Sequence, residues 1–509
     1  MTISRSNRMG LRAYQMKASQ DIHAGFREFG RQLGVLPTGS GKTILFSRLA
    51  EDYQPRRTLI LAHREELITQ AVDKLAAATG IEAQVEMGDE RAALDAPVVV
   101  ASVQTLMREA RRNRWPRDHF GLVVVDEAHH TLVDSYLNTL RHFHDHAKVL
   151  GVSATPDRGD KQNLGRYYQN IACEVTLLDL IQQGWLAPIK VKTVPLGMNL
   201  DSVRTTAGDF NADDLGHALE PYLERIADVL VEHRHRKTLV FLPLISVSER
   251  FAAICRQRGL KAEHVDGQTS DRRAVLNRFR RDETRVLTNA MLLTEGYDEP
   301  SIDCVVCLRP TKVRALYSQI IGRGTRICPG KDHLLVLDFL WQTGEHSLVK
   351  PAHLIAEDDE DAAALTEKLG GEGDLEEARE EVNADRTRKL RERLAINLRR
   401  KGSVLDPLEL AVTLNDAHLA EFVPVMQWQG DAPSPKQLEV LEKFGLDATS
   451  ILTKGHASFL LDRLIMRRRL ELATPKQVCL LRKFGHPRPE LATFKEAQAF
   501  LAIKFGSAA

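Results

Sequence analysis

Residues 33–44 read LGVLPTGSGKTI and place a glycine-rich turn between two apolar stretches. The stretch before the turn is suited to a strand, and the stretch after it is suited to a helix. Gly39 and Gly41 let the turn bend so that backbone N–H groups converge on phosphate oxygens, and Lys42 adds positive charge at the β- and γ-phosphates. The hydroxyl of Thr43 is a ligand for Mg²⁺. The segment therefore predicts a phosphate-binding loop between a strand and a helix.

The loop departs from the usual spelling at one position. The pattern G-x-x-x-x-G-K-[ST] has glycine where this chain has Leu36. That glycine matters for close packing at the end of the strand, whereas the phosphate contacts depend on Gly39, Gly41 and Lys42. A chance turn of the same composition is the alternative, so further residues are needed to support a nucleotide site.

Two carboxylates and two arginines supply what phosphoryl transfer needs beyond the loop. The sequence VVVDEAHH places Asp126 and Glu127 at the end of an apolar strand. One carboxylate there can hold Mg²⁺ while its neighbour orients the attacking water. The sequence QIIGRGTR offers Arg323 and Arg326, which share one helical face, to stabilise charge on the transferring phosphate. By itself, that last segment would be interpreted as a solvated helix surface.

Between residues 31 and 339, short apolar runs alternate with stretches suited to helices. The runs are continuously apolar, which is typical of strands buried on both faces of a parallel sheet. So many strands exceed one compact domain, and glycine and proline cluster at 182–200, so we predict two α/β domains in tandem. The runs lie at 58–64, 97–105, 122–130, 148–156, 238–243, 262–269, 285–290, 303–311 and 334–339.

The composition is that of an ordinary globular protein of 509 residues, with 43% hydrophobic and 27% charged residues. The formal net charge is only +1, so any nucleic acid would have to bind through local basic grooves. No membrane span is expected, because no run of eighteen apolar residues occurs. No secretory signal is expected either, because MTISRSNRMGLRAYQ contains no apolar h-region. The six scattered cysteines favour a reducing cytoplasm. CVVC at 304–307 indicates buried thiols rather than half of a zinc site.

The last third of the chain has a different character. Residues 356–382 are strongly acidic and residues 386–402 strongly basic, which favours a solvated linker that runs into an exposed helix. The alternative is that this segment forms a mobile arm that competes with nucleic acid for a basic groove. Residues 435–445 and 475–485 then repeat each other, 40 positions apart. Each unit has a Ser or Thr cap, a proline in the first turn and a closing glycine, which predicts tandem helical hairpins. These hairpins would either only bury each other's apolar faces or form a module that binds nucleic acid or protein.

The ordered set of segments resembles the motifs of the superfamily 2 DEAD/DEAH-box helicases, over roughly residues 8–340. In chain order they are LRAYQ, LPTGSGKT, AHREEL, SVQTL, DEAHH, SATP, VDGQT, TNAMLLTEGYDEP and QIIGRGTR. The spelling LTEGYDEPSIDCVVCLRPT followed by YSQIIGRGTR is most similar to the RadD-type and type I restriction-motor branch. The resemblance implies two RecA-like domains that use ATP and Mg²⁺ and act on DNA, with RNA the less favoured partner.

The resemblance also implies a role for individual residues. Catalysis would depend on Lys42, Asp126, Glu127, Arg323 and Arg326, and Mg²⁺ would bind Thr43 and Asp126. The nucleotide would contact Gln15, which reads adenine, and Thr38, Gly39, Ser40, Gly41, Lys42, Thr43, Gly296 and Asp298. Ser153 and Thr155 would couple hydrolysis to motion. The nucleic-acid backbone would contact His63, Arg64, Ser102, Gln104, Thr105, Gly267, Thr269, Thr288 and Thr294.

The expected organisation is therefore a RecA-like ATP-binding domain at 1–185 and a second RecA-like domain at 186–345. A charged linker with a helical segment follows at 346–430, and a helical tandem repeat at 431–509. The expected function is an ATP-dependent DNA helicase or translocase, with DNA repair as one pathway. An RNA helicase and a nucleic-acid-binding scaffold that does not unwind are the alternatives.

Overall fold

The computed structural model describes most of the chain. The described residues are 10–154, 164–200, 203–206, 209–294, 296–342, 348–356, 358–397, 407–414, 419, 422, 424, 426–444, 446 and 451–506. The chain divides into two compact units, with the boundary after Ala378, and each unit is described by itself. Thr155, expected to couple hydrolysis to motion, lies outside the described residues.

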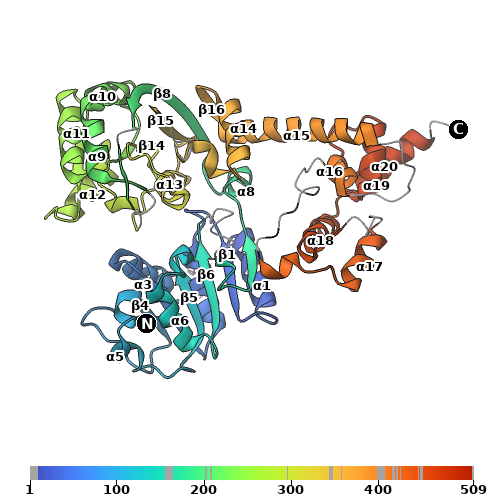
Figure 1. The fold of residues 1–509 in the computed structure, drawn as a ribbon, viewed down its shortest axis with the longest axis horizontal. Coiled ribbons are helices and arrows are strands. Elements are labelled where there is room, and N and C mark those ends of the chain that lie inside the picture. Colours follow the sequence, from blue (N-terminus) through green and yellow to red (C-terminus); the bar gives the residue numbers. More distant parts are fainter. Residues whose placement is uncertain are drawn as a thin grey trace. The chain divides into compact units, whose positions relative to one another are not determined.

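The first sheet has seven strands in the order β3-β4-β2-β5-β6-β1-β7, and every neighbouring pair is parallel. Figure 1 shows it in blue to cyan, with helices beside it. The strands are β1 Arg31–Val35, β2 Arg57–Ala62, β3 Gln84–Glu86, β4 Val98–Ser102, β5 Phe120–Asp126, β6 Lys148–Ser153 and β7 Asn170–Glu174. The helices are α1 Ala13–Gly25, α2 Lys42–Asp52, α3 Glu65–Thr79, α4 Val103–Leu106, α5 Glu109–Arg112 and α6 Asp134–Phe143, with the 3-10 turn η2 Ala128–His130.

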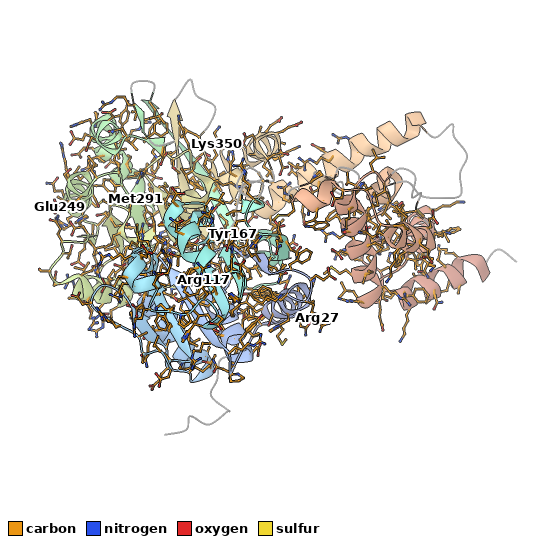
Figure 2. The ribbon with its side chains drawn as sticks, turned by 60° about the horizontal axis from the view of Figure 1, so that its bottom comes forward. Arg27, Arg117, Tyr167, Glu249, Met291 and Lys350 are labelled. Atoms are coloured by element: carbon orange, nitrogen blue, oxygen red, sulfur yellow. The ribbon has the colours of Figure 1, made fainter. Side chains whose placement is uncertain are left out.

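The continuous apolar runs form strands because both faces of this sheet are covered. Along β2, Leu59 and Leu61 belong to one apolar core, whereas Ile60 and Ala62 belong to the core on the opposite face. A strand in that position needs an apolar residue at every step, not at every second step. Side chains fill the space between sheet and helices (Figure 2).

The second sheet also has seven strands, in the order β12-β13-β11-β14-β15-β8-β16, and only β16 is antiparallel to its neighbour. Its strands are β8 Ile189–Asn199, β11 Thr238–Phe241, β12 Ala262–Val265, β13 Val286–Asn289, β14 Cys304–Cys307, β15 Leu334–Gln342 and β16 Glu372–Asp374. Its helices are α8 Leu177–Gln182, α9 Ala212–Leu219, α10 Leu223–Glu232, α11 Ile245–Gln257, α12 Arg272–Arg280, α13 Arg314–Ile321 and α14 Asp359–Leu369. This part of the chain also has a short hairpin, β9 Thr205–Thr206 with β10 Asp209–Phe210. Its turns are η3 Glu220–Tyr222, η4 Leu292–Thr294 and η5 Pro351–Leu354.

The two mostly parallel sheets confirm the predicted fold of tandem RecA-like domains. The stretch at 182–200, interpreted as a break, nevertheless contains β8, the longest strand of the second sheet. Proline is tolerated at Pro195 because β16 pairs only with 190–192 of β8, so no strand among the described residues pairs with that edge at Pro195. The sequence also missed β3, β7 and β16, which lie at sheet edges and lack a continuous apolar run.

The acidic stretch at 356–382 is more ordered than its charge suggests. It contains α14, which buries Ala362, Leu365 and Leu369 at helical spacing, and β16, which joins the second sheet. Acidic residues in the first turn of α14 favour the helix, since they face the positive end of its dipole. Helix α15, Leu375–Asn397, follows directly.

The second unit begins at Arg379, within α15, and contains five further helices and a turn. They are α16 Pro407–Leu414, η7 Gln427–Gly430, α17 Pro435–Lys443, α18 Lys454–Arg469, α19 Pro475–Lys483 and α20 Phe494–Gly506. Its sequence repeat is also a structural repeat. Ser434 caps α17 and Thr474 caps α19, each in a reciprocal pair of hydrogen bonds with the glutamine three residues later. The equivalent residues Leu441 and Leu481 are the buried centres of two small apolar cores. Within the described residues, no helix of the chain is long and apolar enough to cross a membrane.

One carboxyl in the second sheet should make stability depend on pH. Asp338 lies between the buried Leu337 and Phe339 on β15, and burial raises its pKa to about 7. Because the folded pKa is higher than the unfolded one, this carboxyl favours the folded state at low pH, and that contribution is lost as the pH rises through 7. Asp338→Asn should therefore raise the urea midpoint of unfolding at pH 8, and the gain should shrink towards pH 4. The exposed Asp332→Asn serves as the control and should show no such trend. An Asp338→Asn gain that did not change with pH would contradict this assignment.

Candidate active site

The predicted phosphate-binding loop follows β1 and ends where α2 begins at Lys42. Gly39 and Gly41 have φ of +86° and +78°, left-handed values that side chains with a Cβ rarely adopt. Leu36, where the usual pattern has glycine, is fully buried in the core beneath the loop, together with residues of α1 and α2. The departure at Leu36 therefore serves packing and leaves the backbone of the loop free to curve.

Two side chains of α1, those of Tyr14 and Gln15, donate hydrogen bonds to the backbone of the loop. The Gln15 amide donates to the backbone oxygens of Ser40 (2.9 Å) and Gly41 (3.3 Å), and its oxygen accepts from the backbone N–H of Arg12. The hydroxyl of Tyr14 also donates to the Ser40 oxygen. Gln15, expected to read adenine, thus makes its observed contacts with the loop backbone.

The loop has polar atoms that this structure leaves unsatisfied. The hydroxyls of Thr38 and Ser40 are buried and have no hydrogen-bond partner among the described residues. Buried polar groups in native proteins are nearly always satisfied, so an oxygen-rich ligand is expected beside them. These hydroxyls, the loop N–H groups and Lys42 fit a polyphosphate. Thr43 and Asp126 are the oxygen donors that Mg²⁺ prefers.

The two predicted carboxylates lie at the end of β5, and both are buried. Lys42 Nζ lies 3.4 Å from one oxygen of Glu127, and His129 Nδ1 lies 3.5 Å from the other. Burial raises the pKa of Glu127, but Lys42, His129 and Arg323 together outweigh burial and hold that pKa below its usual range. Glu127 is therefore ionised at neutral pH and suited to accept a proton from water. Its backbone has φ of +52°, a strained value of the kind that clusters at functional sites.

The two predicted arginines follow α13 and lie next to the loop. A Cβ added to Gly322 would lie 2.4 Å from Cβ of Thr38, and one added to Gly39 would lie 3.2 Å from Oγ1 of Thr325. Residues 322–326 therefore pack directly against the phosphate-binding loop. This segment carries Arg323 and Arg326, which belong to the α/β region built on the second sheet. The structure thus brings the arginines of this second α/β region to the loop of the first α/β region, which is built on the first sheet.

Each arginine is held by residues that precede it in the same region. Arg323 is buried and donates to the backbone oxygens of Thr294 (2.9 Å) and Tyr297 (2.8 Å). Arg326 lies 2.8 Å from Asp298, whose other oxygen is 3.7 Å from Lys74 of α3. Asp298, expected at the nucleotide, thus pairs with cations here. Gly296, also expected at the nucleotide, lies against α3, since an added Cβ would be 2.9 Å from that of Glu66.

Lys331 is a residue that sequence reasoning did not single out. Its ammonium donates to the backbone oxygens of Gly324 (2.5 Å), Arg326 (2.7 Å), Ile302 (2.5 Å) and Pro300 (3.2 Å). One side chain thereby joins the arginine segment to the loop that precedes β14. No local pattern marks such a lysine, because its four acceptors come together only in the fold.

The predicted nucleic-acid contacts of the first region lie together at the ends of β2 and β4. Gln104 accepts a hydrogen bond from Ser102 Oγ (2.7 Å) and donates to the backbone oxygen of His63 (2.9 Å), and Arg64 is the residue that precedes α3. Thr105 accepts from the backbone N–H of Gly88. The His63 ring also lies 4.7 Å from the His130 ring, beside the carboxylates. Ser153 closes β6, and its backbone oxygen accepts from the Leu36 N–H.

The predicted contacts of the second region are less uniform. Gly267 is exposed, and Thr269 is partly exposed in the turn after β12, where its hydroxyl bonds Asp266. Thr288 and Thr294, by contrast, are buried, and their hydroxyls donate to the backbone oxygens of Ser248 and Met291. This geometry does not bring those two hydroxyls to a surface where a phosphate could bind.

Comparison with known proteins agrees with this geometry. Residues 8–158 match the family described as "Type III restriction enzyme, res subunit", and residues 221–328 match the helicase conserved C-terminal domain. IRC3 of Saccharomyces cerevisiae, an ATP-dependent helicase by its name, is 33% identical over 355 residues, which cover 65% of this chain and 51% of IRC3. The EcoAI endonuclease subunit of an Escherichia coli type I restriction enzyme is 26% identical over 372 residues, covering 64% of this chain and 46% of that protein.

One solved structure shares this fold. The ATP-dependent Type ISP restriction-modification enzyme LlaBIII, solved bound to DNA, superposes with a TM-score of 0.51 at 18% identity, covering 71% of this chain and 30% of LlaBIII. The chain therefore belongs to the superfamily 2 helicases, in the branch of the restriction motors. It spans about half of the length of the curated relatives it matches.

Gln15 allows a test that separates its two roles. Gln15→Glu keeps the shape of the side chain but removes the amide donor to Ser40 and Gly41 and places a negative charge beside their carbonyl oxygens. If Gln15 holds the loop, the KM values for ATP and GTP should rise together, by about tenfold, because the loop is misplaced for either nucleotide. Steady-state nucleotide hydrolysis measures both. A rise for ATP alone would show instead that Gln15 reads the adenine base.

Lys331→Met should lower kcat for ATP about 10- to 100-fold with little change in KM, because it releases the backbone that carries the arginines. Burial lowers the pKa of Lys331 to about 8. The wild-type rate should therefore fall as the pH rises above 8, when the ammonium loses its proton, and this limb should be missing from Lys331→Met. Lys331→Arg should restore part of the rate. A Lys331→Met enzyme with the wild-type kcat would contradict a positioning role.

Proposed function

We propose that this protein is an ATP-dependent DNA translocase or helicase. The observation that carries the proposal is the direct packing of residues 322–326 against the phosphate-binding loop. This packing supports a site in which Arg323 and Arg326 of one α/β region act together with Lys42 and Glu127 of the other. A site built from both regions allows the bound triphosphate to favour their closed arrangement and hydrolysis to release it.

In the proposed reaction, the loop N–H groups and Lys42 bind the β- and γ-phosphates of ATP. Thr43 and Asp126 would hold Mg²⁺, which neutralises charge on the phosphates when bound. Glu127, kept ionised by Lys42 and its other cationic neighbours, accepts the proton of the attacking water. Arg323 and Arg326 stabilise the charge that develops on the transferring phosphate.

DNA is proposed as the track, and RNA as the alternative. The relatives include a restriction-enzyme subunit, and LlaBIII is solved with DNA. On this chain, Ser102, Gln104 and the backbone of His63 form one polar patch at the ends of β2 and β4. Short polar groups of this kind position a phosphate backbone without reading its bases, so little sequence preference is expected.

The remaining parts of the proposal concern context. Arg468, Arg469 and Lys476 are exposed on the helical repeats, which supports these repeats as a contact for nucleic acid or a protein partner. All six cysteines are free thiols, which supports a reducing compartment such as the cytoplasm. DNA repair is the pathway we propose. A scaffold without hydrolysis is disfavoured, because the chain retains Lys42, both carboxylates at the end of β5 and both arginines after α13.

The central test is hydrolysis of ATP with single-stranded DNA, double-stranded DNA, forked DNA and RNA of equal length. DNA should stimulate the wild type more than RNA does. Lys42→Ala should reduce the stimulated rate by at least about 100-fold, because the loop loses its charge on the transferring phosphate. Lys17→Ala, which removes an exposed lysine of α1, should leave the rate unchanged. Greater stimulation by RNA would favour the RNA helicase, and no hydrolysis above buffer would favour the scaffold.

A further inference from the structure

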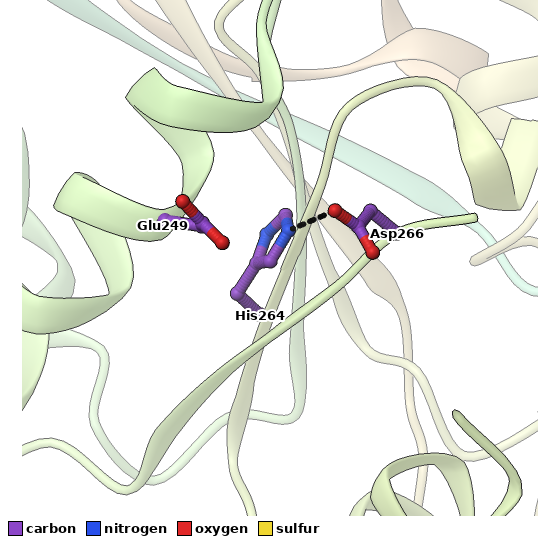
Figure 3. Close-up of side chains that lie close together, drawn as sticks. All are labelled: Glu249, His264 and Asp266. Carbon is purple, nitrogen blue, oxygen red and sulfur yellow. Dashed lines mark ion pairs between the residues drawn. The ribbon is translucent and has the colours of Figure 1, made fainter. Parts of the chain in front are cut away.

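A group of metal-ligating side chains lies in the second α/β region, away from the residues proposed for hydrolysis. Glu249 projects from α11, His264 from β12, and Asp266 follows the end of β12 (Figure 3). One ligand atom from each lies within 4.8 Å of the others. Glu249 is exposed, as its place at the edge of this region in Figure 2 also shows, whereas Asp266 is buried.

The imidazole of His264 is oriented as a metal ligand requires. Its Nδ1 lies 2.7 Å from Oγ of Ser248, and an N–H at Nδ1 that donates to this hydroxyl leaves the Nε2 lone pair available. Nε2 is itself buried and has no hydrogen-bond partner among the described residues. Such an orphaned nitrogen is unusual in a folded protein and calls for a bound partner.

Asp266 also has one oxygen to offer. Its Oδ1 accepts hydrogen bonds from the Gln268 N–H (2.9 Å) and the Thr269 hydroxyl (2.7 Å), which fixes the carboxylate plane. Its Oδ2 is directed to His264 and lies 3.5 Å from Nε2, the pair that Figure 3 joins by a dashed line. That separation is close to the roughly 3.4 Å edge of a tetrahedron of ligands around Zn²⁺.

We propose that Glu249, His264 and Asp266 form a binding site for a divalent transition-metal ion, with zinc as the ion. One imidazole nitrogen and two carboxylate oxygens are a zinc-type ligand set with a coordination position left open. The nitrogen ligand disfavours Mg²⁺, which prefers oxygen ligands and keeps several waters. The side chain of Glu249 is exposed on a helix, so it can swing by the ångström or so that closure around an ion requires.

A simple ion pair between His264 and Asp266 is the competing interpretation. It would leave the exposed Glu249 outside the contact, and it requires a proton on Nε2, carried by the imidazolium or by the neutral tautomer whose Nδ1 accepts from Ser248. Its 3.5 Å separation is also long for a charge-assisted hydrogen bond. A bound ion accounts for all three side chains and for the buried Nε2. It would also hold Asp266, and through it the turn at 266–269, in the geometry seen here.

The test is titration of the full-length protein with Zn²⁺, after removal of bound metal with a chelator and in a large excess of Mg²⁺. Isothermal calorimetry gives the number of sites and their affinities. His264→Asn retains a polar group near Ser248 but removes Nε2, and Glu249→Gln retains the shape of the exposed side chain. Both variants should lose one Zn²⁺ per chain or bind it at least about tenfold more weakly, as even outer-shell losses have that effect.

His235→Asn is the matched control, because His235 is exposed and lies outside the group. This variant should bind Zn²⁺ with the stoichiometry and affinity of the wild type. It shows that losing an exposed histidine outside the group does not by itself reduce Zn²⁺ binding, although other histidines and the exposed Cys479 also take up ions. Co²⁺ bound to the wild type should show the visible absorption bands of an ion with a nitrogen ligand. These bands should be weaker in Glu249→Gln and missing from His264→Asn. Equal Zn²⁺ affinity and stoichiometry in the wild type and Glu249→Gln would overturn the proposal, even if His264→Asn failed to fold.

Discussion

The contact between residues 322–326 and the phosphate-binding loop is the constraint on which the active site depends. Gly322 has no room for a Cβ because Thr38 occupies that space, and a Cβ on Gly39 would lie 3.2 Å from the Thr325 hydroxyl. The two α/β regions therefore meet closely at this point, where the side chains of Leu186, Thr325 and Arg326 also lie against Gly39. A close backbone approach fixes the arginines relative to the loop better than flexible side chains could, because fewer rotatable bonds separate them.

Electrostatics then decides which groups can act. Glu127 is buried, a location that would ordinarily favour its protonated form. Lys42 from the loop, His129 from the same strand end and Arg323 from the second region reverse that preference. One of these three cations, Arg323, comes from the opposite region, so both α/β regions contribute to the lowered pKa of Glu127 in this structure. The base and the arginines of the proposed reaction therefore depend on the same contact between the two regions.

The sequence predicted those parts of the fold and site that depend on local physics. Gly39, Gly41 and Lys42 could be found because the turn requires left-handed backbone and a charge in a fixed order. The inner strands could be found because burial on both faces demands continuous apolar residues. Short edge strands such as β3 and β16 carry no such pattern. Lys331 was missed because its four acceptors come from two separate segments that meet only in the fold. The burial of Thr288 and Thr294 could not be predicted, because a motif does not say which way a hydroxyl faces.

A chain of contacts joins the loop to the polar patch proposed for DNA. It runs from Lys42 to Glu127, then through His129 and His130, whose rings lie 4.1 Å apart, to His63 and Gln104. Proximity along a path does not by itself couple two sites, because coupling needs an element with two states that both ligands bias. Closure of residues 322–326 on the loop is the element that this structure offers. The phosphate-binding loop takes part in this closure, and the contact chain begins at the same loop with Lys42 and Glu127. In the proposed function, a nucleotide at the loop and DNA at the polar patch would therefore bias the same equilibrium.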